Sequence, residues 1–160
     1  MTLEIPTVTL LGPAMVPLVL AARALQTSNV PRFAVIGRVA VTVRLGRVIR
    51  ATTDLDTVTD YRVEPTALQI LRNRDDATYD PAQSHTIFIG GSQVQFQDVA
   101  PVTDAEVEHL EGKQLLYVTA HALESATPIR ILAIDGDEVA EAVVPVAAAG
   151  ALAAMKLDDH

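Results

Sequence analysis

Two aspartates separated by one leucine, Asp54 and Asp56, are the residues whose types and spacing most directly suggest chemistry. On a β-strand, residues two apart point to the same face, so these two carboxylates would lie side by side. Two like charges that close repel each other unless a cation lies between them. Mg²⁺ prefers hard oxygen ligands and shares them with phosphates, and two such ions can activate an attacking oxygen and stabilise a leaving pyrophosphate. The pair therefore favours metal-assisted phosphate chemistry, although the same spacing is common on ordinary surfaces.

An unusual concentration of positive charge precedes this pair, in a chain whose formal net charge is −8. Within 19 residues the sequence places Arg32, Arg38, Arg44, Arg47 and Arg50. One interpretation is a solvated helix face. The other is a phosphate-facing patch beside the carboxylates, and the position next to Asp54 favours it. The overall acidity argues against non-specific binding of nucleic acid by the whole surface.

The composition indicates a folded chain with an aliphatic core. The 160 residues are 49% hydrophobic but only 4% aromatic, and there is no cysteine. Disulfides and thiolate metal sites are therefore excluded, and we predict a cytoplasmic location. The apolar stretch AMVPLVLAA, residues 14–22, lacks a basic start and is too short to span a bilayer, so we predict a core helix opened by proline.

The elements that must position the aspartates can be predicted from periodicity and turn residues. We expect a short buried strand that stops at Gly37, where the missing side chain would let the backbone approach a phosphate. Residues 38–45 fit either a strand or a helix, and we choose a helix capped by Gly46. A strand carrying Asp54 and Asp56 should follow.

The remaining segments are predicted in the same way. We expect helices over 13–27, with Val16, Leu20 and Ala24 on its buried stripe, and over 66–74, from Thr103, over 113–126 and over 148–157. We expect a hairpin over 85–99 closed by Gly90-Gly91, and strands over 128–135 and 141–147. Strands and helices do not alternate strictly, which predicts an α+β fold with a mixed sheet in a single domain over residues 1–160.

Two stretches resemble a known family. Residues 36–56 read IGRVAVTVRLGRVIRATTDLD, and residues 144–157 read VPVAAAGALAAMKL. The first is similar to the signature of the nucleotidyltransferase superfamily that includes DNA polymerase β, and within it to the AbiE-type toxin branch with the MenT toxins. Its matching positions are Gly37, Ala40, Val41, Gly46, Arg50, Thr52, Asp54 and Asp56. The second resembles the segment of that branch that leads to a catalytic lysine on a helix, here Lys156.

The resemblance implies an enzyme that transfers a nucleotidyl group from a nucleoside triphosphate to a hydroxyl. In MenT-like members the acceptor is the 3′ end of a tRNA, the outcome is a block on translation, and a cognate antitoxin is an implied partner. Asp54 and Asp56 would be catalytic and hold Mg²⁺ or Mn²⁺, and Lys156 would contact the triphosphate. The resemblance further assigns nucleotide binding to Gly37, Arg38, Arg47, Arg50 and Thr52.

Three departures from the family pattern leave a second function open. Arg38 stands where the family has a small residue, and it either blocks the phosphate pocket or supplies a different phosphate contact. Gln95 or Gln97 stands where a family strand often carries an Asp, with Asp98 the nearest carboxylate. The family also has a further Asp beyond the lysine, so the sequence is either a truncated form or has lost a C-terminal helical part. The alternative is a catalytically degenerate module that binds or regulates, with Arg38 filling the triphosphate space.

Overall fold

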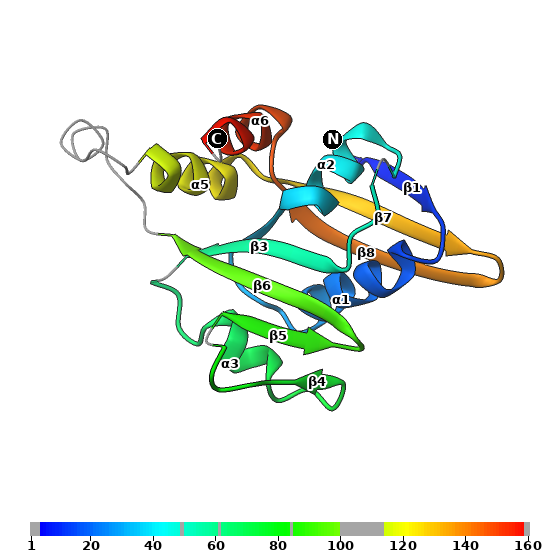
Figure 1. Ribbon diagram of the computed structural model, residues 1–160, viewed down its shortest axis with the longest axis horizontal. Coiled ribbons are helices and arrows are strands. Elements are labelled where there is room, and N and C mark those ends of the chain that lie inside the picture. Colours follow the sequence, from blue (N-terminus) through cyan, green and yellow to red (C-terminus); the bar gives the residue numbers. More distant parts are fainter. Residues whose placement is uncertain (1–3, 49, 61, 84, 100–113, 159–160) are drawn as a thin grey trace.

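A computed structural model describes residues 4–48, 50–60, 62–83, 85–99 and 114–158 of the protein (Figure 1). In chain order the elements are β1 (Thr7–Leu11), α1 (Met15–Thr27), β2 (Phe33–Ile36), α2 (Gly37–Leu45), β3 (Asp54–Asp60), α3 (Ala67–Leu71), β4 (Ala77–Thr78), β5 (Thr86–Ile89), β6 (Ser92–Val99), α5 (Gln114–Ser125), β7 (Thr127–Asp135), β8 (Glu138–Val146) and α6 (Ala149–Asp158). The α+β fold with a mixed sheet is confirmed. The helix expected from Thr103 lies outside the described residues.

The strands form one eight-stranded sheet in the order β1-β7-β8-β2-β3-β6-β5-β4. Three neighbouring pairs are parallel, namely β1–β7, β2–β8 and β3–β6, and the others are antiparallel. The predicted hairpin over 85–99 is therefore confirmed as β5–β6, and the two strands expected over 128–135 and 141–147 pair with each other as β7 and β8. Strand β1 was not predicted: it lies at the sheet edge beside β7, and much of it is exposed, so no clear apolar alternation marks it.

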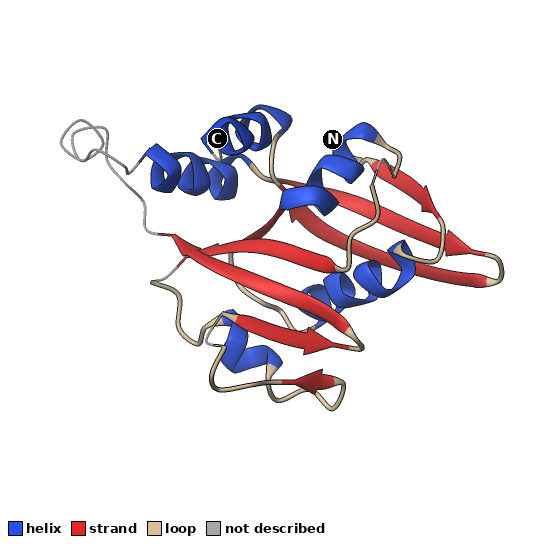
Figure 2. Ribbon diagram, in the orientation of Figure 1, coloured by secondary structure: helices blue, strands red, loops and turns tan. Residues whose placement is uncertain are grey.

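The helices cover both faces of the sheet (Figures 1 and 2). Helix α1 packs mainly on β8 and β7, whereas α2, α5 and α6 gather on the other side. The predicted helix over 13–27 is confirmed, but its buried stripe was partly wrong. Val16 and Ala24 are buried, whereas Leu20 is 51% exposed, and Leu18 and Leu25 take its place in the core. The helix is apolar nearly all round, so periodicity alone did not identify the face that meets the sheet.

The unit β2–α2–β3 has the predicted order of strand, glycine, helix and strand. All four residues of β2 are buried, and the strand ends where Gly37 adopts a φ of 70°. Helix α2 then buries Val39, Ala40 and Val43 against the sheet. Gly46 ends the helix in the left-handed conformation, with a φ of 74°, and its amide donates to the carbonyls of Thr42 and Val43. The choice of helix over strand for residues 38–45 is confirmed.

The core is aliphatic, as the composition indicates. Leucine, isoleucine, valine and alanine side chains from both faces of the sheet make up most of it. In the described part of the chain, no helix has the length and apolar character needed to cross a membrane.

Candidate functional site

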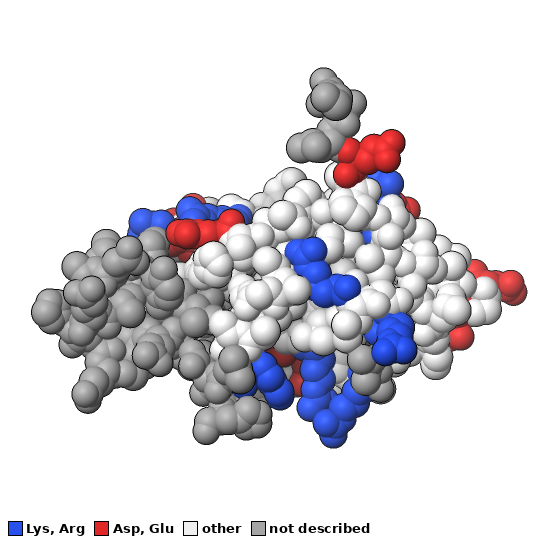
Figure 3. Space-filling model, turned by 90° about the horizontal axis from the view of Figure 1, so that it is seen from above, with Lys and Arg blue, Asp and Glu red and all other residues white. Residues whose placement is uncertain are grey.

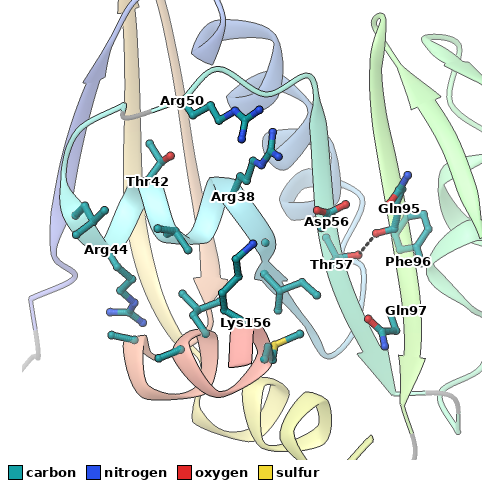
Figure 4. A pocket seen from close by; sticks show the side chains of 18 of the residues that line it. Arg38, Thr42, Arg44, Arg50, Asp56, Thr57, Gln95, Phe96, Gln97 and Lys156 are labelled. Carbon is teal, nitrogen blue, oxygen red and sulfur yellow. Dashed lines mark hydrogen bonds between the residues drawn. The ribbon is translucent and has the colours of Figure 1, made fainter. Parts of the chain in front are cut away.

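A cleft of about 950 Å³ opens where β3, β6, α2 and α6 meet (Figure 4). Drug-sized and cofactor-sized ligands occupy pockets of about 300–1,000 Å³, so the space is sufficient for a nucleotide. Its lining comes from segments more than a hundred residues apart in sequence. Strands β3 and β6 contribute a carboxylate and amide side chains. Helices α2 and α6 contribute both cationic and apolar side chains, the apolar ones being Val41, Leu45, Leu152 and Met155.

The two aspartates lie at the start of β3. Leu55 between them is fully buried, so Asp54 and Asp56 share the opposite face, as predicted. Asp56 lines the cleft, whereas Asp54 is half-buried beside it and accepts a hydrogen bond of 3.3 Å from the Thr53 hydroxyl. Burial raises the pKa of Asp56 above its ordinary value, and the negative charge of Asp54 adds to the rise while Arg38 opposes it.

The N-terminus of α2 lies directly against the Asp56 carboxylate. A Cβ atom built on Gly37 would lie 2.5 Å from Asp56 Oδ2, closer than any real side chain could approach. Only glycine also adopts the local φ of 70° without strain. The sequence predicted that Gly37 lets the backbone approach a phosphate closely. In the structure, Gly37 lets the backbone approach the Asp56 carboxylate. The positive end of the α2 dipole faces the same point.

Four cationic side chains line the cleft, and apart from Arg44 they come from three different elements: Arg38 from α2, Arg50 from the loop before β3, and Lys156 from α6. Figure 4 shows Arg38 and Arg50 extending toward the end of the cleft near Asp56, and Lys156 reaching toward its centre. All three are exposed to solvent. The volume of about 950 Å³ is that of the cleft with the Arg38 side chain in place. Basic side chains also gather on the side of the molecule seen from above in Figure 3, despite the overall negative charge.

The other predicted nucleotide-binding residues lie elsewhere. Arg47 is exposed and does not line the cleft, and Thr52 does not line it either. The Thr52 hydroxyl instead accepts a hydrogen bond of 3.3 Å from the Asp54 amide, which supports the start of β3. Arg44 lines the cleft but donates to backbone carbonyls of the β8–α6 connection. Arg32 does not belong to a phosphate-facing patch: it lies at the opposite end of β2, 3.5 Å from Asp60.

Strand β6 presents glutamines to the cleft. Its parallel pairing with β3 places Gln95 beside Asp56, Gln93 beside Asp54 and Gln97 beside Val58, so all three share the face of the aspartates. Gln95 and Gln97 line the cleft. Asp98 points to the other face, where it accepts a hydrogen bond of 2.6 Å from the Thr59 hydroxyl. Asp98, the carboxylate nearest to Gln95 and Gln97 in the sequence, therefore does not lie with Asp54 and Asp56.

Sequence reasoning missed several lining residues. His85 borders the cleft because β5 pairs with β6, and its Nδ1 lies 3.9 Å from an Asp98 carboxylate oxygen. Phe96 and the apolar side chains of α2 and α6 were also missed. The spacing of these apolar residues in the sequence resembles that of ordinary core positions. Only the tertiary arrangement shows that they line a cleft.

The donor set suits one small divalent cation. Asp54 and Asp56 supply carboxylate oxygens, and Mg²⁺ is commonly held by one or two carboxylates together with substrate phosphates and water. Within the described ranges, no group of three or more histidine, aspartate or glutamate side chains is placed to share a metal.

We compared the chain with models of protein families, with curated protein sequences and with solved structures, and none of the three comparisons gave a match.

Proposed function

We propose that the cleft binds a nucleoside triphosphate with Mg²⁺ or Mn²⁺ and transfers its nucleotidyl group to an RNA hydroxyl. One observation carries this proposal: Arg38, Arg50 and Lys156 converge from separate elements on a cleft lined by Asp56, and Asp54 lies two residues away on the same face of β3. Positive groups around an ion-binding carboxylate pair fit a metal-bound polyphosphate better than a neutral ligand. The resemblance to the AbiE-type toxin branch points to the same reaction class.

Each group in the cleft has a role in this proposal. Asp54 and Asp56 hold the cation, which when bound helps to activate the attacking oxygen and to stabilise the leaving pyrophosphate. Arg38 and Arg50 neutralise and orient the phosphates beside Asp56. Lys156 contacts the triphosphate from the facing helix. The apolar side chains of α2 and α6 exclude water and accommodate the nucleoside.

The finer assignment rests on the resemblance alone. It names the 3′ end of a tRNA as acceptor and a toxin–antitoxin system as the setting, with an antitoxin protein as partner. The cytoplasmic location is proposed separately, from the absence of cysteine. An assay with bulk tRNA and each labelled nucleoside triphosphate in turn tests the acceptor and the donor together.

A second candidate is a binding or regulatory module without catalysis. The observation that favours it is the position of Gln95, a neutral side chain directly beside Asp56. An amide is a weaker ligand for a hard cation than a carboxylate, so the site has fewer charged ligands with which to stabilise a reacting phosphate. This candidate predicts nucleotide binding without transfer.

The deciding experiment combines calorimetry with the transfer assay. The wild-type protein should bind a nucleoside triphosphate in the presence of Mg²⁺ and label tRNA. Asp54→Ala and Asp56→Asn should abolish transfer, whereas Asp137→Asn in the β7–β8 turn removes an equal charge outside the cleft and should have no effect. Binding without labelling would favour the module. No binding of any of the four common triphosphates would refute both candidates.

A further inference from the structure

The eight-stranded sheet is weakly joined at its middle. Strands β7 and β8 share nine residue pairs and β3 and β6 share seven, but β2 and β8 are connected through the single pair Val35–Val146. One of the backbone hydrogen bonds that make this pair runs 3.0 Å from the Ala147 amide to the Val35 carbonyl. This seam divides the sheet into a block of β1, β7 and β8 and a block of the remaining five strands.

The cleft is built across this seam. Asp56 and Gln95 belong to the five-strand block, whereas Lys156 lies on α6, which begins three residues after β8 ends at Val146. The position of the lysine relative to the carboxylate therefore depends on how the two blocks are held together. Helix α1 packs against strands of both blocks on the opposite face from the cleft. On the cleft side, α6 packs against α5 and α2, and both of these helices pack on β2 and β3 of the five-strand block.

Arg44 crosses the seam on the cleft side. Its backbone lies in the last turn of α2, and this helix follows β2 without a loop. Its Nε donates to the Ala147 carbonyl at 2.9 Å, and its Nη2 donates to the Val146 carbonyl at 2.8 Å and to the Thr127 hydroxyl at 3.1 Å. One guanidinium thus bonds to the end of β8, to the start of β7 and to the connection that leads into α6.

We propose that Arg44 is a positioning residue that fixes α6, and with it Lys156, against the carboxylate wall of the cleft. Resting on the proposed function, this assigns to Arg44 a role other than direct neutralisation of phosphate. The three acceptors bound by Arg44 are spread over two strands and a loop. This arrangement suits the planar fork of a guanidinium and not the compact ammonium of lysine. Donors committed to backbone carbonyls are poorly available to a ligand.

The first test is hydrogen exchange in the ligand-free protein. In Arg44→Met, the Ala147 amide should exchange about 10–100-fold faster, because hydrogen bonds from a charged group to the connection are lost. Amides in the middle of β7 and β8 should keep their protection. Thr127→Val removes one of the three acceptors and should give a smaller change in the same direction. It also serves as the test if Arg44→Met does not fold.

Arg130→Met is the matched control. Arg130 forms an ion pair with Glu141 at 2.9 Å within the β7–β8 hairpin, and it neither crosses the seam nor lines the cleft. The substitution makes the same change of side chain and charge, so Ala147 exchange and nucleotide binding should stay at wild-type values. Unchanged Ala147 exchange in Arg44→Met would overturn the proposal.

The second test measures binding of Mg²⁺ with a nucleoside triphosphate in a double-mutant cycle. Arg44→Met should weaken binding about tenfold in the otherwise wild-type protein, but by much less when Lys156→Met is already present, because both act through the lysine. Additive losses would mean that Arg44 contacts the ligand itself and would overturn the positioning role. If the wild-type protein binds no triphosphate, the proposed function fails, while the exchange experiment still decides whether Arg44 holds the seam.

Discussion

Removal of one buried charge at the far end of β3 should destabilise the protein in a pH-dependent way. Asp60 is the last residue of the strand that carries the acidic pair, and only 3% of its side chain is exposed. Arg62 donates to it from Nε at 3.1 Å and from Nη2 at 2.8 Å, and Arg32 lies 3.5 Å away. The substitution Asp60→Asn keeps the shape and removes the charge.

The magnitude follows from the pKa. The hydrogen bonds from Arg62, aided by Arg32, lower the pKa of Asp60 from 3.8 to about 2. At about 1.4 kcal/mol per unit, that shift would correspond to roughly 2–3 kcal/mol. The two guanidinium groups are 46% and 51% exposed, so solvent screening reduces the expected contribution to about 1–2 kcal/mol.

The sign is fixed by linkage. A carboxyl group whose pKa is lowered by folding contributes its full stabilisation above the pKa of the unfolded chain, here 3.8. That contribution is lost as the pH falls toward 2. Urea unfolding of the wild-type protein and of Asp60→Asn should therefore differ by about 1–2 kcal/mol near pH 7, and the difference should shrink steadily below about pH 4.

The chain offers a matched control for this prediction. Arg74 and Asp76 have the same spacing and the same two-bond contact, at 2.8 and 3.0 Å, but the Asp76 side chain is 46% exposed. Asp76→Asn should cost no more than about 1 kcal/mol, because exposed ion pairs contribute little. The reasoning would be refuted if Asp60→Asn cost the same at every pH, or if both substitutions had equal effects.

Two further predictions concern the cleft. Gly37→Ala should lower the free energy of unfolding by about 1–3 kcal/mol and displace the Asp56 side chain. The Cβ of the new alanine would lie 2.5 Å from Asp56 Oδ2, and alanine is strained at the local φ of 70°. Gly46→Ala shares a positive φ but has no neighbour within 4 Å, so it should cost only about 1 kcal/mol, and urea unfolding of the two variants side by side tests the difference. Lys156→Met should weaken triphosphate binding about tenfold by calorimetry and change the free energy of unfolding by less than about 0.5 kcal/mol, since the side chain is exposed. Equal binding by Lys156→Met and the wild-type protein would contradict the assignment of the lysine.

Local signals predicted the unit that carries the candidate site. The apolar run before Gly37, the length of residues 38–45 and the glycine at position 46 are each read within a few residues, and the structure has the strand, helix and cap they predict. The same-face arrangement of Asp54 and Asp56 follows from the strand period alone. Their joint role with Lys156 came from resemblance and stays a proposal, although the structure brings Asp56 and Lys156 to one cleft.

The partners and orientations of the arginines between residues 32 and 50 could not be predicted from their spacing. Arg32 pairs with Asp60, Arg44 bonds to the end of β8, and Arg38 and Arg50 line the cleft. The partners of Arg32 and Arg44 belong to strands that are 28 or more residues away in sequence. A cluster in sequence therefore indicated the charge in this region but not the direction in which each side chain points.

By itself the sequence determined the strand, helix and strand around Gly37 and Gly46 and the face shared by the two aspartates, because periodicity and glycine conformation act over a few neighbouring residues. Only the tertiary structure decided that Gln95 lies beside Asp56, that Asp98 faces away, and that α6 returns to the cleft beside α2. Strand order and register are set by long-range packing and backbone hydrogen bonds, and these are not encoded in any short stretch of the chain.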